Sequence, residues 1–307
     1  MSQTELTVIE RGWLSSNNIV IDDGAGGAVV VDTGYSTHAQ QTLALLQQTL
    51  QGRPLTKIIN THLHSDHCGG NALLAQHFAA PVLIPPGQFE AARVWNEELL
   101  SYRRTGQTCD RFQPDQMLEP GSTLRLGRGL WHVLAAPGHD PDSVLLFESN
   151  HGTLISADAL WERGFGIVFP ELDGDSGFAE VEATLNLIAS LPVSRVIPGH
   201  GGAFSDVKTA LSEARRRLQN FRNDPIRHAR YAAKALVKFH LIEVREQRLA
   251  DLQSWLAGTD IHTRLWSRYF SQMPIQQWTL QVLDELRSGG ALTLEGTLVR
   301  DAVASSP

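Results

Sequence analysis

The sequence predicts a mixed α/β (α+β) protein in which packed sheets carry helices on their outside, followed by a smaller, mostly helical domain. Up to about residue 210, short apolar runs alternate with turns and amphipathic helical patterns, which is typical of sheets covered by helices. After residue 210, nearly every segment has helical periodicity. The 307 residues suit one large domain and one smaller domain. We therefore expect a domain at 1–210 and a helical domain at 211–307.

The first part begins with a hairpin pattern, because apolar runs at 19–22 and 28–32 flank a glycine-rich turn. A helical pattern with serine and threonine as candidate caps follows at 36–50. A short β-branched run at 57–60 then leads into a polar loop. The other expected strands are 81–84, 122–126, 130–136, 143–147, 153–156 and 195–197, and the other expected helices are 70–79 and 178–191.

The second part begins with long helical patterns at 206–223 and 225–247, and another lies at 275–287. Two glycines and two short apolar runs, 291–294 and 297–300, follow the last of these. A helix followed by a turn and a small hairpin predicts a winged-helix-like end.

Composition narrows the function classes. With 26 basic and 33 acidic residues, the net charge of −7 argues against a general polyanion binder. The two cysteines, Cys68 and Cys109, exclude a disulfide scaffold. The N-terminal residues lack a secretion signal and no run is long enough to span a membrane, so we expect a cytoplasmic protein. Residues 211–250 are locally basic, either as a solvated helix face or as a positive rim for an anionic substrate.

Potential metal ligands are concentrated in one loop, His62–His67, which holds three histidines and one aspartate in six residues. Imidazole is the usual ligand for zinc and similar ions, and a carboxylate can complete the shell. Residues two apart in an extended chain point the same way, so His62 and His64 can bind one ion. If the chain then turns, Asp66 and His67 can face a second ion. A chance cluster of surface histidines is the alternative.

Three further candidates each follow an apolar strand directly. They are His139, Asp158 and His200, and all three lie in the same topological place as the His62–His67 loop. Alone, each would more often be a structural turn residue. Together with the loop, they are candidate ligands that complete the site.

Five motifs in order show that the chain resembles the metallo-β-lactamase superfamily over roughly its first 205 residues. They are Asp32-Thr33-Gly34, the His62–His67 loop, Pro137-Gly138-His139, Asp158 and Gly199-His200. The resemblance implies an αββα sandwich with a two-metal site at one edge of the sheets. It further implies that His62, His64 and His139 hold one metal, that Asp66, His67 and His200 hold the other, and that Asp158 bridges both.

This ligand set resembles the glyoxalase II, lactonase and related hydrolase branch, and it differs from class B1 β-lactamases, which use a cysteine at the second site. Cys68 does not occupy that position, and we interpret it as a small packed residue. We expect two divalent ions, zinc first, with iron or manganese as alternatives. Two such ions can share a hydroxide at neutral pH, and the resemblance suggests that Asp66 is also catalytic, holding or relaying the proton of this nucleophile.

Two departures from the family pattern stand beside this site. Ala157 occupies a position where the family often has glycine, which affects the backbone shape. Asp140 and Asp142 surround His139, where they can accept a hydrogen bond from the ring of His139 or cap a turn.

Candidate substrate-binding residues come from both parts of the chain. Aromatic residues after Asp158 can line an apolar pocket or belong to the core. Basic residues of the helical part can reach the substrate, as in glyoxalase II. The candidates are Trp161, Phe165 and Phe169 in the first part and Arg227, His228 and Arg230 in the second.

The leading hypothesis is a dinuclear hydrolase of an ester, thioester or lactone that acts on a small molecule. One alternative is a phosphodiesterase or endoribonuclease with a nucleic-acid substrate, a less favoured partner. A second is an oxidoreductase with one iron, like the persulfide dioxygenases. A third is a DNA-binding protein that acts through its C-terminal domain. We expect no membrane partner, and the apolar helical faces allow a homodimer.

Overall fold

The computed structural model describes residues 6–302 and divides the chain into two compact units. Unit 1 comprises the chain up to residue 102 and residues 108–219, and unit 2 comprises residues 103–107 and the chain from residue 220 onward. The boundary expected at residue 210 falls inside helix α8 (Val207–Asn223), most of which belongs to unit 1. Arg215 in this helix donates a hydrogen bond to Asn186, and the guanidinium of Arg217 lies over the ring of Phe165, both in unit 1.

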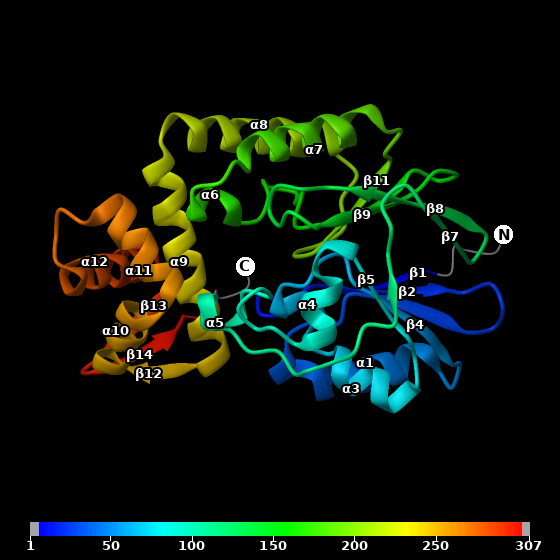
Figure 1. Ribbon diagram of the computed structural model, residues 1–307, viewed down its shortest axis with the longest axis horizontal. Coiled ribbons are helices and arrows are strands. Elements are labelled where there is room, and N and C mark those ends of the chain that lie inside the picture. Colours follow the sequence, from blue (N-terminus) through cyan, green and yellow to red (C-terminus); the bar gives the residue numbers. More distant parts are fainter. Residues whose placement is uncertain (1–5, 303–307) are drawn as a thin grey trace. The chain divides into compact units, whose positions relative to one another are not determined.

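Unit 1 contains two sheets (Figure 1). The first has the order β1-β2-β3-β4-β5-β6, antiparallel from β1 to β3 and parallel from β3 to β6. The second has the order β11-β10-β9-β8-β7, with only β10 and β11 parallel. The strands of the first sheet are β1 (Leu6–Ile9), β2 (Asn18–Asp22), β3 (Ala28–Val31), β4 (Leu55–Ile59), β5 (Val82–Ile84) and β6 (Gln116–Met117). Those of the second are β7 (Thr123–Leu126), β8 (Gly129–Ala135), β9 (Val144–Glu148), β10 (Thr153–Ala157) and β11 (Arg195–Pro198).

The two sheets pack face to face. Successive side chains of a strand point to opposite faces of its sheet, so every second residue can face the other sheet. Ile19 and Val31 of the first sheet share a buried cluster with Val133 and Leu146 of the second. Val20, next to Ile19, belongs instead to a cluster on the other face of the first sheet. Besides α8, the helices of unit 1 are α1 (Ala39–Leu50), α2 (Ser65–Cys68), α3 (Asn71–Phe78), α4 (Phe89–Val94), α6 (Phe169–Asp173) and α7 (Phe178–Ser190), with short 3-10 turns at Ser36–His38 and Pro86–Gln88. Most of the short helix α5 (Tyr102–Thr105) belongs to unit 2.

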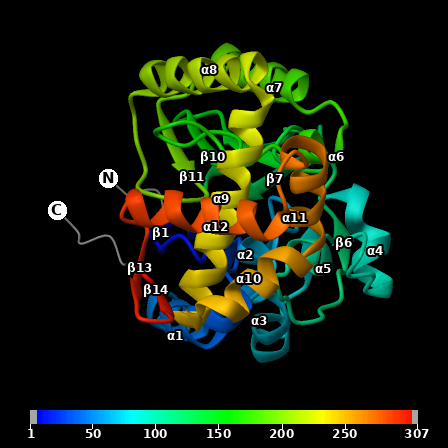
Figure 2. The same ribbon diagram turned by 90° about the vertical axis from the view of Figure 1, so that its left-hand side faces the viewer.

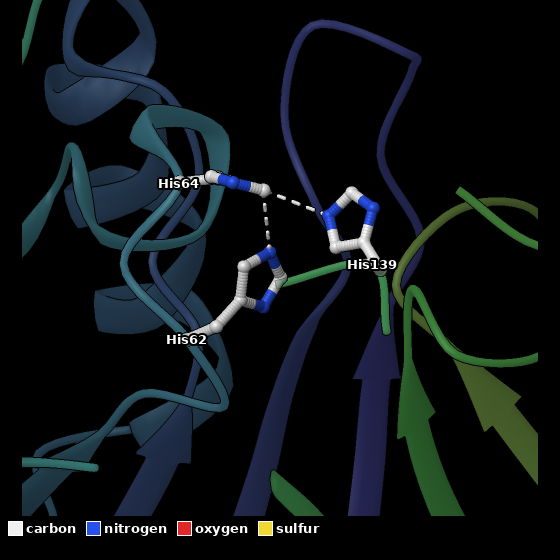
Figure 3. Close-up of side chains that lie close together, drawn as sticks. All are labelled: His62, His64 and His139. Carbon is white, nitrogen blue, oxygen red and sulfur yellow. Dashed lines mark hydrogen bonds between the residues drawn. The ribbon is translucent and has the colours of Figure 1, made fainter. Parts of the chain in front are cut away.

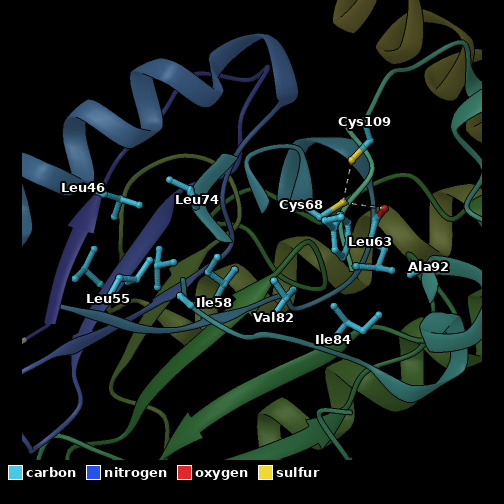
Figure 4. Close-up of a cluster of buried hydrophobic side chains, with 14 of the residues drawn as sticks. Leu46, Leu55, Ile58, Leu63, Cys68, Leu74, Val82, Ile84, Ala92 and Cys109 are labelled. Carbon is cyan, nitrogen blue, oxygen red and sulfur yellow. Dashed lines mark hydrogen bonds between the residues drawn. The ribbon is translucent and has the colours of Figure 1, made fainter. Parts of the chain in front are cut away.

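That outer cluster joins helices to the first sheet, as Figure 4 shows. Leu46 of α1 and Leu74 of α3 pack there with Ile58 of β4. Cys68 is fully buried in the same cluster, as expected for a small packed residue, and its Sγ lies 3.8 Å from that of Cys109. Both thiols are free. The expected sandwich of two sheets with external helices is confirmed.

Unit 2 combines helices with a small antiparallel sheet of order β12-β14-β13. The last helix leads into the β13–β14 hairpin, and the winged-helix-like character of this end stays a prediction. Its elements are α9 (Pro225–Val244), β12 (Glu246–Arg248), α10 (Leu249–Gly258), α11 (Asp260–Leu265), a π-helical turn (Trp266–Phe270), α12 (Ile275–Ser288), β13 (Leu292–Glu295) and β14 (Leu298–Asp301). Figure 2 shows helices α9 to α12 and the strands β13 and β14. From residue 6 to residue 302, no helix has both the length and the apolar character that crossing a membrane requires.

Acidic residues of unit 2 pair with part of the basic stretch at 211–250. Arg230 Nε lies 3.7 Å and Lys234 Nζ lies 3.1 Å from carboxylate oxygens of Glu285. Lys238 forms an ion pair with Asp301. These ion pairs reduce the positive charge that α9 presents. They favour the interpretation of this stretch as a solvated helix face over its interpretation as a positive rim for an anionic substrate.

Unit 2 should lose stability in acid, because His262 must gain a proton when the unit unfolds. Burial lowers the pKa of His262 from 6.5 to about 3. Between these pH values the unfolded state binds more protons than the folded state. The contribution of His262 to the free energy of unfolding is therefore fully present above pH 6.5 and is lost as the pH decreases. The expected loss at pH 5 is about 2 kcal/mol relative to neutral pH.

Urea unfolding of the wild type and of His262→Phe, at neutral pH and at mildly acidic pH, measures this loss. Phenylalanine keeps an aromatic ring beside Trp255 and Trp278, whose centroids lie 5.1 and 6.4 Å from that of His262. The free energy of unfolding should fall less in the variant. An equal fall in both proteins would contradict the assignment.

Candidate metal centre

Three histidines converge where β4 ends and β8 leads into the next loop (Figure 3). His62 Nε2 lies 3.1 Å from His64 Nδ1, which lies 2.7 Å from His139 Nε2. Tetrahedral coordination with metal–nitrogen bonds of about 2.1 Å separates ligand atoms by about 3.4 Å. The three nitrogens therefore form one compact group that could hold a metal ion.

A second group lies beside the first. Asp66 Oδ2 is 3.0 Å from His200 Nε2 and 3.8 Å from His67 Nε2. Asp66 and His67 come from the short helix α2, and His200 follows β11. These three side chains could also hold a metal ion.

Asp158, directly after β10, faces both groups. Its Oδ2 lies 3.5 Å from His139 Nε2, and its Oδ1 lies 3.4 Å from His67 Nε2 and 3.8 Å from His200 Nε2. Each oxygen of this carboxylate is thus directed to a different group. The structure brings together all seven side chains that the sequence singled out as ligands.

The donor set fits divalent metal ions. Its imidazole nitrogens and carboxylate oxygens are ligands that zinc, iron and manganese accept. His67 Nε2 is buried and has no hydrogen-bond partner among the described residues, although it faces two carboxylates. A buried polar atom without a partner is costly, and a metal ion at this position would satisfy it.

Hydrogen bonds at the opposite ring nitrogens orient three of the histidines. Thr61 Oγ1 lies 3.1 Å from His62 Nδ1, and the carbonyl oxygen of Ile167 lies 2.6 Å from His139 Nδ1. His67 Nδ1 lies 2.8 Å from Asp32 Oδ2. Such partners fix the tautomer and ring orientation of metal-binding histidines.

Asp32 has a structural task that the sequence motif did not reveal. It is buried, and besides His67 it accepts hydrogen bonds from the backbone N–H of Thr61 (2.9 Å) and the hydroxyl of Thr61 (2.8 Å). Its φ of 57° lies in the left-handed region, which aspartate tolerates better than most residues. Asp32 therefore ties the start of the ligand loop to the ring of His67.

Asp140 and Asp142 do not accept a hydrogen bond from His139, one of the two roles considered for them. His139 Nδ1 is already paired with Ile167. The backbone N–H of Asp142 donates to Asp140 Oδ1, which is the turn cap considered as the alternative. Asp140 Oδ2 instead lies 3.6 Å from His64 Nε2.

Ala157 adopts a φ of 46° immediately before Asp158. This left-handed conformation costs an alanine roughly 1 kcal/mol, whereas glycine adopts it freely. Glycine at this position would avoid that cost.

Burial controls the protonation of the first group. It lowers the pKa of His62 well below its usual value, and it lowers the pKa of both His64 and His139 to about 4. A buried imidazolium is costly, so these three rings are neutral near pH 7 and can donate lone pairs to a metal.

The second group behaves differently because carboxylates surround it. Burial alone would lower the pKa of His67, but Asp32, Asp66 and Asp158 raise it well above its usual value. Burial would likewise raise the pKa of Asp158, but His200 and His67 hold it well below the ordinary range. A metal ion entering this group would therefore displace a proton from His67.

Two of the three aromatic candidates contact the cluster. The indole N–H of Trp161 donates to Asp158 Oδ1 at 3.2 Å. The ring of Phe169 lies 4.7 Å from that of His64 and 5.6 Å from that of His139. Phe165 is only 1% exposed and packs under Arg217, as a core residue does.

The three basic candidates belong to unit 2. Arg227 lies in the first turn of α9, where its backbone N–H donates to the Asp224 cap. His228 is buried with its ring 4.9 Å from that of Phe221. Arg230 is directed to Glu285 and lies over the ring of Phe270. Contact of these residues with a substrate stays a prediction.

Sequence reasoning missed Trp13 and Asn17. Trp13 stacks on His200 with ring centroids 5.3 Å apart. The side-chain amide of Asn17 donates to the carbonyl oxygens of Pro198 and Gly201, on both sides of His200. Neither residue lies in a ligand motif, so their proximity to His200 becomes visible only in the folded chain.

Comparison with protein families decides the relationship. The model of the metallo-beta-lactamase superfamily matches residues 11–200 of this chain. The chain belongs to the metallo-beta-lactamase superfamily. The matched residues include all five motifs on which the resemblance was based, so that prediction is confirmed. Metallo-beta-lactamase membership also accounts for the His and Asp groups at one edge of the sandwich.

Three individual superfamily members each share between 26% and 29% sequence identity with this chain. A hydroxyacylglutathione hydrolase from Nitrobacter winogradskyi is 29% identical over 195 residues, which cover 63% of this chain and 65% of that protein. The match therefore covers less than two thirds of that relative. The human acyl-coenzyme A thioesterase MBLAC2 is 26% identical over 206 residues, covering 62% of this chain and 73% of that protein. Among solved structures, TTHA1623 in a di-iron-bound form is 26% identical with a TM-score of 0.55, covering 68% of this chain and 98% of that one.

Proposed function

We propose that this protein is a metal-dependent hydrolase that uses a dinuclear site to cleave a small ester or thioester. The observation that carries the proposal is the division of seven buried or half-buried ligands into two groups that share Asp158. In this proposal His62, His64 and His139 would hold one ion, Asp66, His67 and His200 would hold the other, and Asp158 would serve both groups. The di-iron form of TTHA1623 supports a pair of ions on this fold.

Divalent ions bound here would lower the pKa of a water ligand toward about 7 and polarise the carbonyl of a substrate. The residues of the chain supply the rest. Asp66 leaves 12% of its side chain exposed, so its carboxylate can accept and hold the proton of the attacking water. Trp161 contacts the cluster at Asp158 and Phe169 contacts it at His64, so both place apolar surface beside the ligands.

The names of the relatives favour acyl substrates. One is named as a hydrolase of a hydroxyacylglutathione and another as an acyl-coenzyme A thioesterase. We therefore place thioesters first, ahead of simple esters and lactones. Zinc is the metal we propose first, with iron or manganese as alternatives, because this donor set suits all three.

Metal analysis of protein purified without added metal, followed by turnover of an ester and thioester panel, tests the proposal. We expect about two divalent ions per chain, with hydrolysis that is lost on chelation and restored by zinc. A single iron with oxygen uptake and no hydrolysis would overturn the proposal in favour of an iron oxidoreductase. Salt-sensitive binding and cleavage of single-stranded RNA, without thioester turnover, would overturn it in favour of a nuclease.

A further inference from the structure

We propose that Trp13 and Trp161 form an aromatic wall beside the metal centre that positions His200 and Asp158 and receives the apolar acyl group of the substrate. The second half of this inference rests on the proposed hydrolase function, because it specifies which part of the substrate the wall contacts. The first half concerns only ligand geometry and can be tested by metal binding.

Among the described residues, His200 lacks the kind of hydrogen bond that orients three of the other histidine rings. Its Nδ1 is buried without a hydrogen-bond partner among the described residues. His62, His67 and His139 each have an oxygen at the corresponding nitrogen. The orientation of the His200 ring therefore depends on other contacts.

The two tryptophans supply those contacts. The ring of Trp13 stacks on that of His200 at 5.3 Å with an interplanar angle of 15°. Trp161 meets His200 edge-on at 5.7 Å and 83°, and it meets Trp13 at 5.3 Å and 70°. Stacked and edge-on contacts at these distances are favourable and restrict ring rotation. The same Trp161 ring donates its N–H to Asp158 Oδ1, the oxygen that faces His67 and His200.

The loop that carries Trp13 is held in place by its backbone. The backbone N–H of Ser16 donates to the carbonyl oxygen of Asp66 at 2.9 Å, and that of Asn17 donates to the carbonyl oxygen of Gly199 at 2.7 Å. Both acceptors lie in or beside ligands of the second group. The loop is thus fixed directly to the two segments that carry Asp66 and His200.

Side-chain hydrogen bonds on both sides of Trp13 also hold this loop. The guanidinium of Arg11 donates to Asn18 Oδ1 and Thr42 Oγ1, each at 2.8 Å. Ser15 Oγ accepts from the backbone N–H of Tyr35 and lies 2.8 Å from His38 Nδ1. The Trp13 side chain therefore projects from an ordered loop, which makes the wall preorganised.

Trp13 is nevertheless 58% exposed, although it stacks on a buried histidine. A large exposed aromatic ring directly beside a candidate metal centre is a suitable contact for an apolar ligand group. Because the ring carries no charge, the part of the substrate that it favours is a hydrocarbon acyl chain. The inference therefore places the acyl group on the His200 side of the centre.

Four variants separate the two roles of the wall. Trp13→Ala removes the exposed ring of the wall, and Trp13→Phe retains an aromatic ring there. Trp161→Phe keeps a ring but removes the N–H that contacts Asp158. Leu99→Ala truncates another exposed apolar side chain of unit 1 and serves as the control. Circular dichroism establishes that each variant is folded.

The first readout is retention of zinc at the group of Asp66, His67 and His200, measured as its release to a chromogenic chelator. Trp13→Ala and Trp161→Phe should each release it at least about tenfold more readily, as loss of outer-shell support does at other metal sites. Trp13→Phe and Leu99→Ala should behave like the wild type. Unchanged retention in both Trp13→Ala and Trp161→Phe would overturn the positioning role.

The second readout is the ratio of kcat/KM for octanoyl and acetyl thioesters of the same thiol. Trp13→Ala should reduce this ratio about tenfold, since an apolar contact to the substrate discriminates acyl groups to that extent. Trp13→Phe, Trp161→Phe and Leu99→Ala should preserve most of it. An unchanged ratio in Trp13→Ala would overturn the acyl contact, whereas a wild type without thioester turnover would instead contradict the proposed function.

Discussion

Replacement of Asp158 by asparagine should remove about one metal ion per chain and reduce kcat/KM roughly a thousandfold. The carboxylate directs one oxygen to His139 and the other to His67 and His200. An amide has only one oxygen, so its NH2 group must face one of the two ligand groups. That ligand group then loses an oxygen that could bind a metal ion and instead faces N–H hydrogens, which repel the ion. Metal content after gel filtration and steady-state kinetics on a thioester measure both effects.

Glu148→Gln is the matched control for Asp158→Asn. Glu148 is also a buried carboxylate of unit 1, but it accepts hydrogen bonds from the backbone N–H groups of Asn150 and His151. Its replacement should lower stability without changing metal content. Asp158→Asn should remain folded, because the sandwich core does not depend on this side chain. Global unfolding of Asp158→Asn together with loss of activity would show that the centre is structural.

The ligands could be predicted from sequence because their chemistry is unusual and their position is regular. Histidine and aspartate directly after apolar strands are visible without knowledge of the fold, and the ends of neighbouring strands meet at one edge of a sheet. The contacts that orient these ligands could not be predicted. Trp13 lies in a loop without periodicity, and it meets His200 only because the backbone of Ser16 and Asn17 docks beside Asp66 and Gly199.

The same distinction applies to the fold. Strands β8 and β9 were predicted within one or two residues, because β8 alternates buried and half-buried residues and β9 is a continuous buried, mostly apolar run, both of which leave a clear sequence pattern. Strand β12 was missed, since its residues are glutamate, glutamine and arginine. The helix expected at 225–247 ends at Val244, where Arg245 takes a φ of 67° and the chain turns into β12. Nothing in the local residue pattern marks that turn.

The second large effect is expected at Asp32, which binds no metal in the proposed assignment. Asp32→Asn should weaken metal binding at the second group by roughly 10- to 100-fold. Asp32 accepts from Thr61 through both of its oxygens and from His67 Nδ1 through Oδ2. An asparagine must direct its NH2 group at one of these partners. If it faces His67, the ring proton moves from Nδ1 to Nε2, the atom required for the metal. If it faces the N–H of Thr61, the start of the ligand loop loses its buried acceptor.

Isothermal titration of metal-free protein with zinc at several pH values measures this effect. Asp32, Asp66 and Asp158 raise the pKa of His67, so the metal-free wild type holds a proton there that zinc must displace. Wild-type affinity should therefore decrease as the pH is lowered through neutrality, and Asp32→Asn should have both a lower affinity and a shallower pH dependence. Asp22→Asn removes a carboxylate of the same unit that pairs with Arg53, and it should match the wild type. If Asp32→Asn also matched the wild type at every pH, His67 would have to obtain its orientation from its metal alone, and the buried Asp32 network would then serve the loop rather than the ligand.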